Sequence, residues 1–191
     1  MHTSPLALSR RAPGGPVSLR CREAVARAGP AGLRAPDPAR LAKPLELLLR
    51  VVAAGTAGAS AEQVVPALWP ASDARRWRAS LTAALRALDA QLAVRSAVVL
   101  DGDRLLVREA ALRVDSLDFE RALAPLLNPF RTPGPQEIEG ARIAVASFGG
   151  AEFLPGNESA WARAARMRIA DAAGRAARRI AQPHFRNERR T

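Results

Sequence analysis

The sequence predicts an α+β fold that is mainly helical, and three features support this prediction. Leucine, valine and alanine recur at helical spacing in three consecutive segments between residues 43 and 93. Asp101-Gly102 lies between two short apolar runs, which is a strong β-hairpin signal. Residues 160–181 form a long alanine- and arginine-rich run. With 4% aromatic residues and no tyrosine, the core must rest on leucine, valine and alanine, a composition that favours helices.

Residues 1–40 predict a flexible basic segment. Six prolines and several glycines interrupt it, which leaves little room for regular structure. The stretch PVSLRCREAVARAG can hold one short strand or a helical turn. A basic arm of this kind can touch DNA phosphates, and a leader without a role is an equal alternative.

Helical order is expected to begin near Pro44, because proline suits the first position of a helix. Gly55 can end this first helix. Ser60 is a good N-cap for a second helix, and Gln63 three residues later completes a capping-box pattern. Pro70 stops the second helix.

A third, longer helix is expected over about residues 72–93, capped by Ser72 or Asp73. The period then changes to that of a hairpin in SAVVLDGDRLLVRE. LRVDSLDFERALAPLL begins extended and passes into another helix. Residues 128–140 read as a loop between modules, and ARIAVASFGG after them as helical. The final helical run, 160–181, precedes a frayed tail.

Two short helices, a longer third helix and a hairpin follow the order expected of a winged helix. A small helical bundle with an appended hairpin fits the same periodicity. The chain therefore divides into a flexible N-terminal segment, a winged helix, a partial helical module and a basic tail. Their expected bounds are 1–40, 41–121, 122–182 and 183–191.

The chain carries a net charge of +11 with a pI of about 11.6, which favours nucleic acid or an acidic surface as a partner. The charge lies at the two ends: residues 1–60 carry +6, residues 129–191 carry +5, and residues 61–128 are neutral. Coding bias is the alternative, since Lys43 is the only lysine and arginine supplies the rest. Any basic face in the middle block must therefore come from placement rather than excess.

The sequence also predicts a cytoplasmic protein. Cys21 is the only cysteine, so one chain has no disulfide framework. No apolar run approaches the roughly 20 residues of a membrane span. The arginines near the N-terminus follow no continuous apolar stretch, so no signal peptide is expected.

Three motifs follow one another along residues 41–182. KPLELLLRVVAAGTAGASAEQVVPALWP precedes a helix ending LTAALRALDAQL, and LLVREAALRVDSLDFERAL and FGGAEFLPGNESAWARAARMRI come later. Together they resemble bacterial transcriptional activators of the antibiotic regulatory protein (SARP) type. The matching positions are Val114, Asp115, Phe119, Phe153, Leu154, Pro155, Gly156, Trp161, Arg166 and Arg168.

This resemblance implies a response-regulator-like winged helix that binds DNA, followed by a truncated, TPR-like bacterial transcriptional activation domain. The family has a small antiparallel sheet before its first helix, of which residues 1–40 show at most a remnant. Its activation domain also continues through further helices and is followed by other domains. A fragment of a larger regulator is therefore one expectation for this chain.

The third helix carries the candidate DNA-binding residues. Residues three and four apart share a helix face, which places an arginine stripe opposite Leu81, Leu85, Leu88 and Leu92. The stripe consists of Arg75, Arg78 with Ala79, Thr82 and Arg86, and Arg76 can reach the phosphate backbone from the flank. Guanidinium groups pair with phosphates or with guanine edges. A solvated face without a ligand is the alternative.

Arg104, at the hairpin bend, is the candidate wing residue for a phosphate or the minor groove. A turn arginine between acidic neighbours is the alternative, because Asp101 and Asp103 would repel a nearby phosphate. Asp89, at the end of the third helix, also departs from the basic pattern of the family.

No catalytic constellation is present in the sequence. His2 and His184 lie in expected tails, no Cys/His spacing suits a metal, and no phosphate-binding loop occurs. We therefore expect a sequence-specific DNA-binding transcriptional regulator, not an enzyme, that needs no cofactor or metal. Its expected partner is double-stranded DNA, with RNA polymerase and a second copy as possible partners and no membrane. The alternative is a protein-interaction module that keeps the winged-helix scaffold without DNA recognition.

Overall fold

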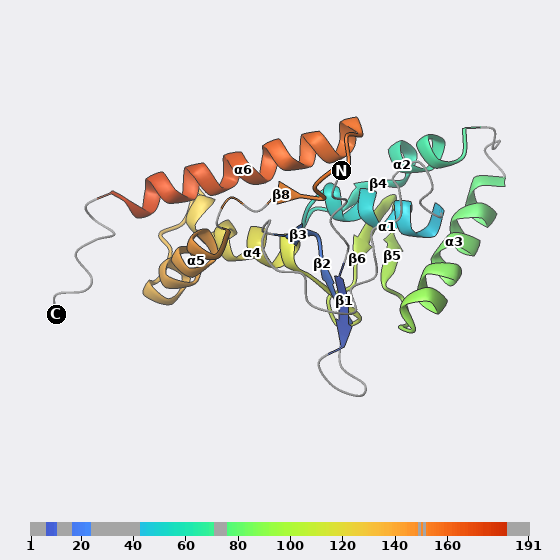
Figure 1. Cartoon of the computed structure of the whole chain (residues 1–191), viewed down its shortest axis with the longest axis horizontal. Helices are drawn as coiled ribbons and strands as arrows, with labels where there is room; N and C mark the ends of the chain where they lie inside the picture. Colours follow the sequence, from blue (N-terminus) through green and yellow to red (C-terminus); the bar gives the residue numbers. More distant parts are fainter. Residues whose placement is uncertain are drawn as a thin grey trace.

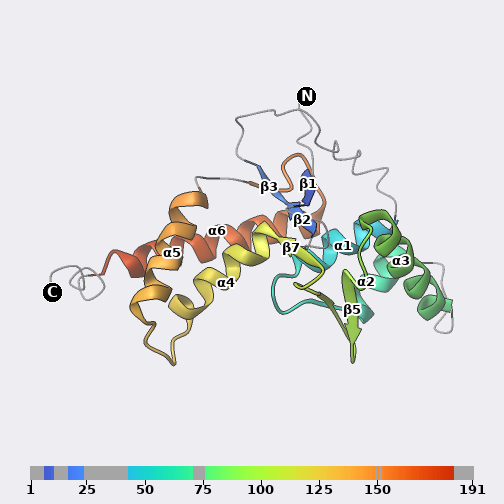
Figure 2. The same cartoon turned by 90° about the horizontal axis from the view of Figure 1, so that it is seen from below.

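Residues 7–10, 17–23, 43–70, 76–148, 150 and 152–182 are described by the structure, a computed structural model of the chain. In these residues, six helices and eight short strands form an α+β fold that is mainly helical, as predicted. Helices α1–α3 lie at one end of the molecule and α4–α6 at the other, with the strands between them (Figures 1 and 2).

The first three helices form where the sequence predicts them. They are α1 (Lys43–Ala53), α2 (Ala61–Leu68) and α3 (Arg76–Leu92). Helix α1 lies at the centre of this group: it packs against α2, α3 and strand β6 (Arg104–Val107). The leucines and valines between Leu47 and Val52 are almost completely buried. Arg50, which lies among them, is partly exposed. The expected caps of α3, Ser72 and Asp73, lie outside the described residues.

The expected capping box of α2 does not form among the described residues. Ser60 holds the N-cap position with extended backbone angles, but its side chain makes no capping hydrogen bond there. Ser60 instead belongs to a two-residue strand, β4 (Ala59–Ser60), that pairs with β6. The amide of Ala61 donates to the carbonyl of Asp103 at 2.8 Å. Strand pairing therefore replaces the side-chain cap at the start of α2.

The hairpin predicted around Asp101 is present. Strands β5 (Val98–Asp101) and β6 pair antiparallel from Val98↔Val107 to Asp101↔Arg104, and the sheet order is β4-β6-β5. Gly102 takes a positive φ of +59° in the two-residue turn, a conformation that glycine adopts without steric cost.

Short strands form within residues 7–10 and 17–23 of the segment expected to be flexible, and in PVSLRCREAVARAG the strand alternative holds. Strands β1 (Ala7–Arg10) and β2 (Val17–Arg20) pair antiparallel, and β2 pairs in parallel with β7 (Leu112–Val114). Strand β3 (Arg22–Glu23) pairs with β8 (Glu152–Phe153). Strands β2 and β3 each pair with a strand far along the chain, and local proline and glycine content does not reveal those partners.

Helices α4 (Asp115–Leu127), α5 (Pro135–Phe148) and α6 (Ala160–Ile180) pack against one another. Helix α5 begins inside residues 128–140, which the sequence predicts as a loop. Pro135 takes the first helical position, where its missing N–H costs nothing. The Glu137 carboxylate accepts a hydrogen bond from the Gly134 amide at 2.9 Å. That amide, with the Arg131 side chain, lowers the pKa of Glu137.

One continuous set of buried side chains runs through the described residues, from Val17 in β2 to Ala176 in α6. The boundary expected at 121/122 falls inside α4. Helix α6 also contacts α1 directly: Arg168 donates to the Ala53 carbonyl at 2.9 Å and pairs with Glu120 of α4 at 2.6 Å. The two helical groups therefore share one core.

In the part of the chain that the structure describes, no helix has both the length and the apolar character that a membrane span requires.

Candidate nucleic-acid interface

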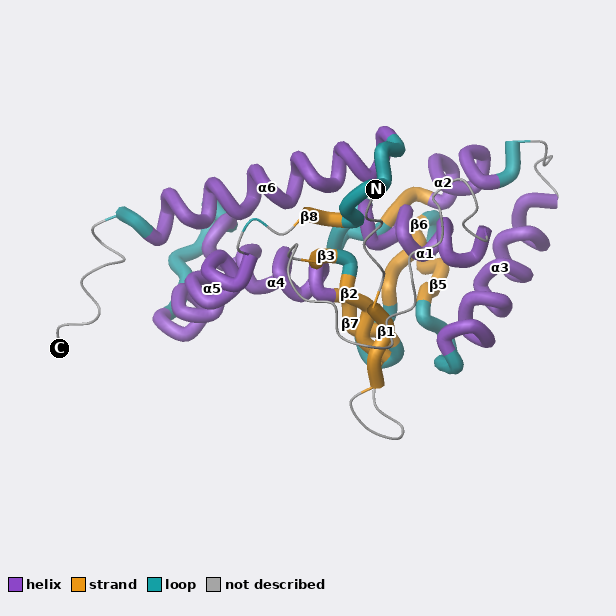
Figure 3. Tube along the Cα trace, viewed as in Figure 1, coloured by secondary structure: helices purple, strands orange, loops and turns teal. Residues whose placement is uncertain are grey.

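One face of α3 points away from the core. Leu81, Leu88 and Leu92 are buried with Ala84 on the inner side of the helix. Five residues on the opposite side are exposed, and helical spacing places them on one face. They are Ala79, Thr82, Ala83, Arg86 and Ala90, and we call this set the outer α3 face. The helix lies at one end of the molecule, away from α5 (Figure 3).

The arginines predicted on this helix occupy different positions. Arg86 lies within the outer α3 face, and no hydrogen bond or ion pair of its side chain occurs among the described residues. Arg76 is exposed one turn before Ala79 on the same side of the helix. Arg78 is exposed on the flank, and its guanidinium lies 5.2 Å from the centre of the Trp77 ring. Arg75 lies outside the described residues. The structure therefore brings Ala79, Thr82 and Arg86 together, with Arg78 beside them.

The Arg104 side chain donates hydrogen bonds to two backbone carbonyls of the same chain. Its Nε donates to the Ala57 carbonyl at 2.8 Å, and one terminal nitrogen donates to the Gly58 carbonyl at 2.9 Å. These bonds fix the hairpin to the connection between α1 and β4. Arg104 is exposed but has two donors engaged, which favours a structural role over a phosphate contact.

The hairpin tip is short and acidic. Asp101 pairs with Arg104 across a two-residue turn, and Asp101 and Asp103 are both exposed. The Asp103 carbonyl is engaged by the amide of Ala61. Two carboxylates beside the turn disfavour close approach of a phosphate. If a polyanion binds here, the outer α3 face, not the hairpin tip, must provide the contact.

Asp89 has a structural role that the sequence did not reveal. Its carboxylate oxygens accept hydrogen bonds from the Ser96 amide at 2.7 Å and from the Ala97 amide at 2.9 Å. The turn that it braces contains two non-glycine residues with positive φ, Ala93 at +50° and Ser96 at +57°. Asp89 therefore holds the connection between α3 and β5, and both of its carboxylate oxygens are engaged by that turn.

Replacing Asp89 with asparagine should lower the free energy of unfolding by about 1–2 kcal/mol, because an amide NH₂ would face a backbone N–H that now donates to a carboxylate. Urea denaturation followed by circular dichroism measures the change. Asp171→Asn is the control, since Asp171 is exposed and, among the described residues, its one ion pair is the i,i+4 pair with Arg175; it should cost under about 0.5 kcal/mol. Equal costs for the two variants would contradict the bracing role.

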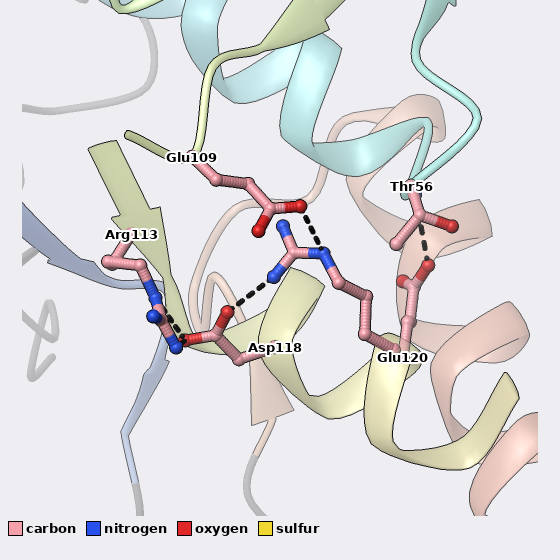
Figure 4. Close-up of polar contacts among 6 residues, drawn as sticks. Thr56, Glu109, Arg113, Asp118 and Glu120 are labelled. Atoms are coloured by element: carbon pink, nitrogen blue, oxygen red, sulfur yellow. Dashed lines mark hydrogen bonds and ion pairs between the residues drawn. The ribbon is translucent and has the colours of Figure 1, made fainter. Parts of the chain in front are cut away.

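In the C-terminal half, most of the arginines that the structure describes form ion pairs with aspartate or glutamate side chains of the same chain. Arg113 and Arg121 both pair with Asp118, at 3.0 and 2.5 Å, and Arg121 also pairs with Glu109 at 2.7 Å (Figure 4). Asp115, at the start of the same helix, accepts a hydrogen bond from the Cys21 amide at 2.8 Å. Further ion pairs involve Arg131, Arg142, Arg166, Arg168 and Arg175.

Two other exposed positions near α3 were missed by sequence reasoning. Ala90 belongs to the outer α3 face, and its spacing of four from Arg86 was a usable signal. Arg95 is exposed in the turn after α3, and its backbone carbonyl accepts a hydrogen bond from Arg108 at 3.0 Å. The turn conformation that presents Arg95 depends on Asp89, so local sequence gave no signal for it.

Among the described residues, no group of histidine, cysteine and acidic side chains could hold a metal ion. Comparison of the chain with protein families, with curated proteins and with solved structures finds no match.

Proposed function

We propose that the chain is a sequence-specific DNA-binding transcriptional regulator, not an enzyme, and that residues 41–121 form a winged helix. The order α1, β4, α2, α3 and the β5–β6 hairpin supports this, as does the pairing of β4 with β6. The observation that carries the proposal is the outer α3 face. Its residues are exposed along the helix, they include three alanines, and its charged group is Arg86, with the exposed Arg76 one turn before Ala79 on the same side.

In this proposal α3 enters the major groove. A guanidinium fork matches the O6 and N7 acceptors of guanine, which makes Arg86 the base-reading residue. Ala79, Ala83 and Ala90 let the helix backbone approach the floor of the groove. Arg76, at the start of the helix, and Arg78, on its flank, contact phosphates and position the helix without reading sequence.

The helices α4–α6 would serve as the partial activation-type module. Arg168 and Glu120 fix α6 and α4 to the end of α1, so a protein bound to these helices would be held in a defined position relative to α3. RNA polymerase is the partner that the SARP resemblance implies, and a homodimer on repeated sites is compatible with the proposal. Transcription from a promoter carrying the selected site tests this part.

Replacing Arg86 with alanine should weaken specific binding by about 1–3 kcal/mol, because a bidentate contact to guanine is lost. Alanine is the best helix former, so the helix should remain intact. Fluorescence anisotropy with a duplex selected from a random pool measures the change. The control is Arg163→Ala on α6, an exposed arginine with no ion pair among the described residues. Equal affinity of wild type and Arg86→Ala for the selected duplex would reject this placement of the interface.

A protein-interaction module is the second candidate. The acidic hairpin tip and the internal bonds of Arg104 favour it, because both remove the wing contact that a DNA-binding winged helix would make. A folded chain that binds no duplex DNA at low salt, where phosphate contacts are strongest, would establish this candidate over the first.

A further inference from the structure

Strand β5 is an edge of its sheet. The order is β4-β6-β5, and of the described elements β6 is the one that packs along β5. In an antiparallel pair, the backbone groups of successive residues point alternately toward the neighbouring strand and away from it. The Arg108 amide donates to the Ala97 carbonyl at 3.0 Å, so the N–H and C=O groups of Val98 and Leu100 point outward. Among the described residues these outward groups have no hydrogen-bond partner.

The edge formed by β5 also lacks the usual protection against another strand. Proteins commonly place a lysine, a proline or a bulge on such an edge, because unpaired backbone groups can pair with a further strand. The sequence of β5 is VVLD, its register with β6 is continuous, and its end protrudes at the lower edge of Figure 2. Leu100 is 43% exposed and shares a face with the buried Val98. The edge therefore offers backbone groups and apolar surface to an extended segment.

The two ends of this edge carry opposite charges. Arg95 and Arg108 are exposed where β5 begins, and Asp101 and Asp103 are exposed where it ends. The side chains of Arg95, Asp101 and Asp103 form no hydrogen bond or ion pair among the described residues. Arg104 is also near the acidic end, but its guanidinium is bonded to two carbonyls in the connection before β4. An antiparallel copy of the same edge would bring each basic end beside an acidic end, whereas a parallel copy would oppose like charges.

We propose that the β5 edge is a dimer interface, at which two copies of this chain pair their β5 strands antiparallel about a two-fold axis at Val99. In this register Val98 of each copy exchanges both backbone hydrogen bonds with Leu100 of the other. The exposed Leu100 side chain is then covered by the other copy. Arg95 of each copy lies beside Asp103 of the other, because the two residues are equally far from Val99 along the chain.

The proposed dimer is closed and symmetric, because the same edge serves both copies and the pairing uses up both outward strands. Pairing through one four-residue strand buries less surface than a standard interface, so we expect a dissociation constant on the order of 10–100 µM. The inference goes beyond the proposed DNA-binding function and does not depend on it.

The experiment follows the full chain over about a hundredfold range of concentration around that value. Sedimentation velocity should show a monomer that converts to a dimer. Residue-resolved hydrogen exchange by NMR locates the contact. The amides of Val98 and Leu100 should exchange about three- to fivefold more slowly at the highest concentration than at the lowest. The amides of Val99 and Asp101 are the internal control, because they point toward β6 in both states.

Charge reversal tests the register. Arg95→Glu and Asp103→Arg each place like charges side by side, and each should weaken dimerisation about three- to tenfold. The double variant restores opposite charges and should return to within about twofold of wild type. Arg163→Glu on α6 changes the net charge as Arg95→Glu does, at an exposed arginine without an ion pair among the described residues. It should leave dimerisation within about twofold.

Leu100→Lys tests the edge itself, because a lysine on an edge strand opposes pairing. It should weaken dimerisation at least about tenfold while the circular dichroism spectrum stays that of the folded chain. A wild-type chain that remains monomeric overturns the proposal. A dimer that forms without protection of the Val98 and Leu100 amides, or that is insensitive to both Leu100→Lys and charge reversal, also overturns it and places the contact elsewhere. Protection that requires an extended peptide of another protein would assign the edge to that partner instead.

Discussion

Replacing Gly58 with alanine should destabilise the fold by about 2–5 kcal/mol. Gly58 has a φ of +71°, and a Cβ atom there would overlap the Leu105 carbonyl oxygen and lie 2.5 Å from Leu106 Cδ2. A left-handed backbone costs an alanine about 1–2 kcal/mol. The overlap adds about 1–3 kcal/mol, because the atom it meets first is backbone.

Neither side of this contact can move easily. Leu105 pairs with Ala59 in the sheet, and the Gly58 carbonyl accepts a hydrogen bond from Arg104. Gly102→Ala is the matched control: its φ is +59°, and no described atom lies within 4 Å of the added Cβ. It should cost only the backbone term, about 1–2 kcal/mol. Urea denaturation of both variants measures the difference, and a Gly58→Ala cost no larger than that of Gly102→Ala would contradict the close packing.

Replacing Leu88 with alanine should cost about 2–5 kcal/mol. Leu88 has an exposed fraction of 0% on the inner side of α3, where that helix packs against α1. Removal of its side chain loses the transfer free energy and leaves a cavity that the surrounding helices fill only in part. Thermal or urea denaturation gives the change in the free energy of unfolding.

Leu100→Ala is the control for Leu88→Ala, because Leu100 is 43% exposed on β5. Its substitution should cost less than about 1.5 kcal/mol. If Leu88→Ala were no more destabilising than this control, α3 would not be anchored by its leucine side. The opposite side could then not be assigned as the outer face.

Local signals predicted much of this fold. The inner leucines of α3 recur at helical spacing, so both its position and its exposed side follow from the sequence. The hairpin follows from the change of period around Asp101. Helix α6 matches the expected run at 160–181 to within one residue at its end.

The remaining parts depend on contacts between distant residues. Strand β2 pairs with the nearby β1 and also with β7, where Val17 pairs with Leu112 and Leu19 with Val114, and nothing near residue 17 predicts this second partner. The same holds for Glu120, which meets Arg168 only when α6 folds back over α4 and α1. Such pairs cannot be predicted from the sequence because no local periodicity of residue types marks two residues that meet only in the folded chain.

Only part of the candidate site could be predicted, because the rest depends on contacts between distant residues. Thr82 and Arg86 follow from the helical period alone. The use of Arg104 within the chain depends on two backbone carbonyls in another loop, at Ala57 and Gly58. The bracing by Asp89 depends on a turn with unusual backbone angles. A charge pattern along one helix cannot distinguish such internal contacts from contacts to a ligand.

We propose that the outer α3 face recognises a DNA sequence. The most direct test titrates the full chain against the selected duplex and against a scrambled duplex of the same length and composition, at one physiological salt concentration. Specific recognition predicts that the selected duplex binds at least about 10³-fold more tightly. Equal affinity for the two duplexes would contradict the claim, because it would reduce the interaction to attraction between arginines and phosphates.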